Sequence, residues 1–158
     1  MLKFLLKGVR RLPIEFGDLE KPRTPNSFLM APEGVCHKAV PDAGSPAFPV
    51  PVETLREVFK VVALSHPRVE ALPENLPENF PESLPDNPPG EVPLQDEYVQ
   101  YSKGIGFPDT ITVRFLPAGE GGSTLAVFSR AHYGIRDFGV NRNRVLLWIE
   151  ELRNRLKA

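Results

Sequence analysis

Charged residues of both signs gather in the last third of the sequence, around the segment SRAHYGIRDFGVNRNRVLLWIEEL, residues 129–152. A helix that begins near Asn141 would carry Arg142 and Arg144 in its first turn, where partial positive charge disfavours cations. Either carboxylates, whose oxygens match the guanidinium fork, or a bound anion must compensate them. The candidate site or structural ion-pair cluster comprises Asp109, Arg130, His132, Asp137, Asn141, Arg142 and Arg144.

A predicted β-hairpin would position these residues. Residues 109–116 and 123–133 alternate apolar and polar side chains, and the Gly-rich PAGEGG segment between them is typical of a turn. The apolar faces of the two strands coincide when Phe115 lies opposite Leu125 and Val113 lies opposite Val127. This register also places Arg130 opposite Thr110, beside Asp109.

Asp137 would lie just before the closing helix, so we expect two carboxylates and three guanidinium groups to meet at one end of the sheet. Ion-pair networks that fix a turn resemble ligand sites in their residue types. We therefore favour a structural role for the cluster over an anion site.

Other groupings of reactive residues are weaker. Ser129, His132 and Asp137 are the residue types of a catalytic triad, but residues three apart on a strand point to opposite faces. The three histidines have no ligand spacing, so we expect neither a metal nor another cofactor. A lone cysteine, Cys36, excludes an intrachain disulfide.

The remaining elements predict an α+β fold. Helices are expected over 51–65 and 142–156, the second with Asn141 as its N-cap, and a further strand over 97–103. Residues 13–51 are expected to form an ordered but irregular wrap. We predict an antiparallel sheet of three to four strands with two helices packed on one face.

A proline-rich insertion at 72–93 interrupts the single domain expected over 13–158. Its sequence, LPENLPENFPESLPDNPPGEVP, repeats an apolar-Pro-acidic-Asn/Ser unit four times, and proline excludes a regular sheet or a long helix there. The segment is either a surface excursion or a docking arm for a protein partner.

Residues 1–12 form a short basic segment with the spacing of an amphipathic helix. It would either lie on an anionic membrane surface or pack on its own domain. The segment is too short and too charged to be a transmembrane span, so we expect a cytoplasmic protein or one peripheral to the membrane. The formal net charge of −1 gives no support to nucleic-acid binding.

The order of motifs resembles that of the domain of unknown function family 1499, uncharacterised proteins of bacteria and plants. The family pattern combines an aromatic-x-Asp strand start, a Ser-Arg strand, a Gly-x-x-Asp-x-Gly-x-Asn-Arg-x-Arg turn and a closing helix. TPNSFLMAPEG, which begins at Thr24, resembles its upstream Pro-Asn opening. Matching residues are Phe107, Asp109, Ser129, Arg130, Gly134, Asp137, Gly139, Asn141, Arg142 and Arg144. The resemblance implies a fold and no activity.

These observations favour a non-catalytic binding or scaffolding domain, associated with a membrane surface or the cell envelope. One alternative is a small hydrolase-like enzyme that uses the Asp/Arg/His cluster. Another is a module that binds an anionic small molecule or a lipid. A catalytic site would require a concave pocket with at least two of the clustered groups facing solvent.

Overall fold

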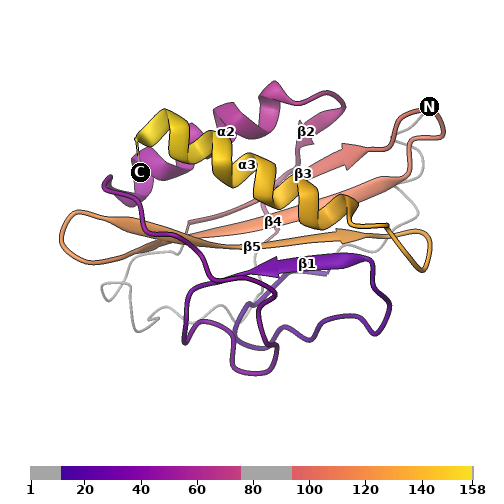
Figure 1. Cartoon of the computed structure of the whole chain (residues 1–158), viewed down its shortest axis with the longest axis horizontal. Helices are drawn as coiled ribbons and strands as arrows, with labels where there is room; N and C mark the ends of the chain where they lie inside the picture. Colours follow the sequence, from indigo (N-terminus) through magenta and orange to yellow (C-terminus); the bar gives the residue numbers. More distant parts are fainter. Residues whose placement is uncertain (1–11, 76–93, 158) are drawn as a thin grey trace.

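In the computed structural model, which describes residues 12–75 and 94–157, two helices cover one face of a five-stranded sheet (Figure 1). The strand order is β1-β5-β4-β3-β2, and neighbouring strands are antiparallel throughout. The predicted α+β class is therefore confirmed. The elements are β1 (Ser27–Met30), α2 (Val52–Ser65), β2 (Val69–Ala71), β3 (Leu94–Tyr101), β4 (Pro108–Pro117), β5 (Ser123–Ala131) and α3 (Val140–Leu156).

The central hairpin of β4 and β5 has the register that its alternating pattern predicts. Phe115 pairs with Leu125, and Thr110 pairs with Arg130. The agreement has a simple cause, because a shift of one residue would turn every apolar side chain of a strand to the wrong face.

The predicted number of strands was too low, because the described part of the chain contains five. β1 and β2 have only four and three residues, too few to show a period of two. β1 lies within the segment that was expected to be an irregular wrap. β3 also begins three residues earlier than predicted, at Leu94.

The helices and one face of the sheet enclose the larger apolar core. Phe59 of α2 lies at its centre, with its ring 6.0 Å from that of Trp148 and 5.6 Å from that of Phe115, measured between centroids. Apolar residues that recur with the helical period form a buried stripe on α3 and face this core. They are Val145, Trp148, Ile149 and Leu152.

The N-terminal segment covers part of the opposite face of the sheet (Figure 1). Phe16 packs there with Phe128 and other apolar residues in a second cluster. Arg114, which is almost fully buried, reaches from β4 to Glu15 with 3.2 Å between Nη2 and Oε2. Burial lowers the pKa of Arg114, and its guanidinium lies over the Phe16 ring. The sheet is thus a middle layer between helices and an irregular wrap.

Two predicted segments fall largely outside the described residues. Of the basic segment 1–12 only Leu12 is described, and of the proline-rich insertion 72–93 only residues 72–75. Both remain predictions from the sequence.

Candidate functional site

Arg144, on the first turns of α3, is the centre of a polar network at one corner of the sheet. Its Nη2 donates to Asp109 Oδ2 at 2.9 Å, and its Nε donates to Gln100 Oε1 at 2.5 Å. Nη1 donates to Ser129 Oγ at 3.0 Å and to Asn141 Oδ1 at 2.7 Å. Only 7% of the side chain is exposed. One guanidinium therefore joins β3, β4, β5 and α3.

Asp137 provides the negative charge at the start of α3. Its Oδ1 accepts a hydrogen bond from the Gly139 amide at 2.9 Å, and its Oδ2 accepts from the amide and the side-chain Nδ2 of Asn141 at 3.2 and 2.8 Å. A carboxylate at this position satisfies free amides and suits the positive end of the helix.

The prediction that Asn141 is the N-cap was wrong. α3 begins at Val140, and the N-cap position is Gly139, whose φ of 81° lies in the left-handed region that favours glycine. Asn141 is fully buried in the first turn. Its Nδ2 also donates to the backbone oxygen of Asn26 at 3.1 Å, so its side chain is a node of the network.

Asn26 fastens the loop between β5 and α3 to the start of β1. Its Nδ2 donates to the Gly134 oxygen at 3.0 Å, and its own backbone oxygen accepts from the Ala131 amide at 3.0 Å. The sequence reasoning left Asn26, Ser129 and Gln100 out of the site. Asn26 and Ser129 belong to the motifs that resemble the family, whereas no pattern in the sequence points to Gln100.

The structure does not bring all the predicted residues together. Arg130 has the expected partner in the register but lies on the opposite face of the sheet, with Phe128. Its Nε donates to Thr110 Oγ1 at 3.4 Å, and His132 Nε2 lies 2.9 Å from the same oxygen. Arg130 and His132 line a cavity of about 310 Å³ there. The expected meeting of three guanidinium groups was wrong, because alternate strand residues point to opposite faces.

Arg142 is exposed and lines an open hollow of about 560 Å³ with Asp137 and residues of the N-terminal segment. The two arginines at the start of α3 therefore differ. Asp109 compensates Arg144, whereas Arg142 extends to the surface.

Burial dominates the electrostatics of Asp109. Desolvation raises the pKa of this carboxyl above its ordinary value of 3.8, Arg144 acts in the opposite direction, and Asp137 adds a smaller upward effect. The ionised carboxylate is therefore less stable in the folded protein than in water, even beside its partner.

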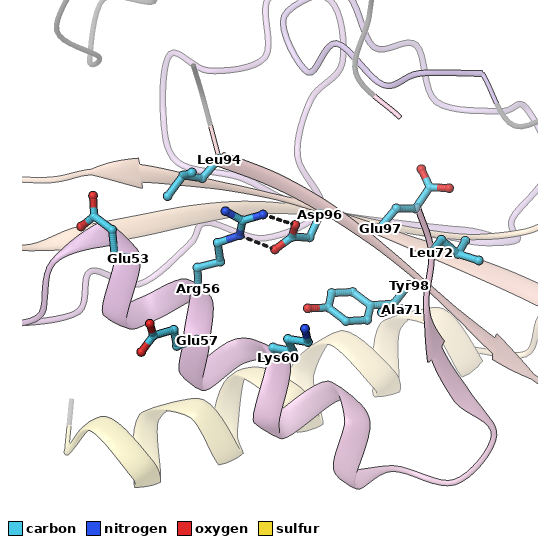
Figure 2. A pocket seen from close by; sticks show the side chains of 10 residues that line it. All are labelled: Glu53, Arg56, Glu57, Lys60, Ala71, Leu72, Leu94, Asp96, Glu97 and Tyr98. Atoms are coloured by element: carbon cyan, nitrogen blue, oxygen red, sulfur yellow. Dashed lines mark hydrogen bonds and ion pairs between the residues drawn. The ribbon is translucent and has the colours of Figure 1, made fainter. Parts of the chain in front are cut away.

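A different hollow, of about 470 Å³, lies between α2 and β3 (Figure 2). Arg56 of α2 reaches across it and grips Asp96 with two hydrogen bonds of 2.8 and 2.7 Å. Burial, followed by the charge of Asp96, raises the pKa of the Tyr98 hydroxyl beside them. This partly exposed pair ties α2 to β3 and contributes at most about 1 kcal/mol.

Within residues 12–75 and 94–157, no three His, Cys, Asp or Glu side chains are placed to hold a metal ion. None of the helices described there is both long and apolar enough to cross a bilayer. Burial raises the pKa of the Cys36 thiol, the effect opposite to the one that activates a nucleophile.

The fold and the corner together define an α+β domain whose closing helix is locked to the sheet by a buried guanidinium. The family profile described as "Protein of unknown function (DUF1499)" matches residues 20–156, nearly the whole chain, and the chain belongs to this family. Neither the curated proteins nor the solved structures contain a match.

Several of the residues that carry the family resemblance lie in this corner, whereas Arg130 lies on the opposite face of the sheet and Arg142 is exposed. Asn26, Asp109, Ser129, Asp137 and Arg144 come from five places in the sequence and share one hydrogen-bonded network. This part of the motif therefore describes the geometry of the corner.

We predict that Arg144→Met lowers the free energy of unfolding by about 3–5 kcal/mol, since it leaves the buried Asp109 carboxylate without its cation. Urea denaturation measures this change. Arg142→Met is the matched control, because this exposed side chain on the same turn should contribute less than about 0.5 kcal/mol. Similar small losses in both variants would contradict the assignment.

The raised pKa of Asp109 predicts an unusual pH dependence. Because the folded carboxyl binds its proton more tightly than the unfolded one, its contribution to stability falls as the pH rises from 3.8 through the folded pKa. The free energy of unfolding of the wild type, minus that of Asp109→Asn, should decrease as the pH rises from below 3.8 to neutral. An increase over this range would show instead that Arg144 outweighs burial.

Proposed function

We propose that this protein is a non-catalytic binding domain in which the corner network holds two neighbouring loops for contact with a partner. The main support for this proposal is that the hydrogen bonds of the network are all made within the protein. Every guanidinium nitrogen of Arg144 is bonded to the protein's own side chains, and little of the group is exposed. A catalytic site instead needs polar groups that face a concave surface open to a substrate.

The separation of the predicted cluster also favours binding over hydrolase-like catalysis. Asp109 and Arg144 lie on the helix side of the sheet, whereas Arg130 and His132 lie on the other side, beside Thr110. The residues that an enzyme of this kind would use are therefore divided by the sheet.

The network holds the loops that project from one end of the sheet. The β3–β4 loop, residues 102–107, and the β5–α3 loop, residues 132–139, lie at the same end (Figure 1). The two loops contact each other through aromatic rings, since the ring centroids of Phe107 and Tyr133 are 5.5 Å apart. We call residues 102–107 and 132–142, which include the first residues of α3, the loop end.

Large apolar side chains are exposed over the loop end. Isolated exposed apolar residues are ordinary, but a group of them on adjoining loops is typical of an interaction surface. Loops held by a rigid scaffold are also where proteins most often place binding residues. The exposed residues are Ile105, Phe107, Tyr133, Ile135, Phe138 and Val140.

The proposal can be tested with the double variant Ile135→Ser/Phe138→Ser in the tagged full-length chain. In extracts of the cells that make the protein, the wild type should fractionate with larger or particulate material. The variant should move to the position of the free chain, because it lacks the apolar contact.

The matched control is Val40→Ser/Val61→Ser, which removes two exposed apolar side chains outside the loop end. This control should fractionate as the wild type does. Identical fractionation of the loop-end variant and the wild type would contradict the proposal.

A further inference from the structure

We infer that the loop end docks on an anionic lipid surface. This inference rests on the proposed function and names the partner of the same surface. It is supported by the exposure of the apolar side chains, by the backbone that presents one of them, and by the charges of the same segments.

Phe138 is the most exposed of these side chains. Its surface is 89% accessible, with Ile135 at 69% and Ile105 at 66%. Its φ of 52° lies in the left-handed region, which is unfavourable for a residue with a bulky side chain. Local strain persists only where the surrounding structure imposes it. Here the Gly139 amide donates to Asp137 Oδ1, which constrains the backbone on both sides of Phe138, and the ring is exposed.

The charges of the loop end are complementary to lipid phosphates. Lys103, Arg136 and Arg142 are exposed and belong to the same two segments as the apolar side chains. The only carboxylate within residues 102–107 or 132–142 is that of Asp137, which accepts three hydrogen bonds at the start of α3. The neighbouring Asp109 is paired with Arg144. This arrangement gives Arg142 a role at a position where a cation is otherwise disfavoured.

A loop end with exposed apolar and cationic side chains is better suited to contact with a bilayer than to contact with a second copy of the chain. In a membrane interface the apolar side chains enter the acyl boundary, while Lys and Arg remain among the anionic headgroups. In a symmetric dimer the same patch would face itself and bring like charges together. An acidic protein partner remains as an outcome of the test.

The experiment is co-sedimentation of the purified full-length chain with two kinds of vesicle. One is phosphatidylcholine alone, and the other contains a minor share of phosphatidylglycerol. We expect sedimentation with the anionic vesicles, weakened by salt, and little with the neutral ones. Ile135→Ser/Phe138→Ser should weaken binding roughly tenfold. Lys103→Gln/Arg136→Gln/Arg142→Gln should abolish the preference for phosphatidylglycerol.

Two controls match these variants. Val40→Ser/Val61→Ser changes two exposed apolar residues outside the loop end, and Lys60→Gln/Arg153→Gln/Arg155→Gln changes one exposed lysine and two exposed arginines there. Both should bind anionic vesicles as the wild type does. If the loop-end variants bind anionic vesicles as strongly as the wild type, the inference is wrong, and residues 1–12 become the candidate for membrane contact.

Absence of sedimentation with anionic vesicles would also overturn it. If the loop-end variant is nevertheless released from the particulate fraction of cell extracts, the binding domain stands and its partner is an acidic protein. If neither experiment responds to the variant, both the lipid inference and the proposed function fail.

Discussion

The arrangement of α3 and the central strands depends on the burial of one guanidinium group, that of Arg144. A cation cannot be removed from water unless its hydrogen-bond donors and its charge are both satisfied. Here one carboxylate supplies the charge, and Gln100, Ser129 and Asn141 supply the further acceptors. Each acceptor belongs to a different element, so the need to satisfy one side chain fixes how α3 meets the three central strands.

This requirement extends to the loop that precedes α3. Asn141 accepts from Arg144 and donates to Asp137 and Asn26, so the loop conformation is tied to the buried cation through one amide group. Networks of this kind contribute specificity of geometry as well as stability. Phe138 is exposed within that loop despite its unfavourable backbone conformation. The network around Arg144 therefore also constrains the loop that exposes Phe138.

The sequence allowed accurate predictions where a periodic pattern decides the structure. The register of β4 and β5 follows from the alternation of apolar and polar residues, which a single sequence displays. β1 and β2 are too short for such a pattern. At Arg130 the predicted register is right, but the side chain lies on the face of the sheet opposite to Asp109 and Arg144, so it does not join their network. Gln100 could not be predicted, since it lies 44 residues from its partner Arg144 and no local signal links them.

Amide hydrogen exchange tests the central claim most directly, because it reports on the loop itself. If Arg144 holds the loop through Asn141 and Asp137, the amides of Gly139 and Asn141 should be protected in the wild type and should exchange much faster in Arg144→Met. The amides that pair β4 with β5 should keep most of their protection. Unchanged protection of Gly139 and Asn141 in the variant would show that the loop is held without Arg144, and would contradict the account.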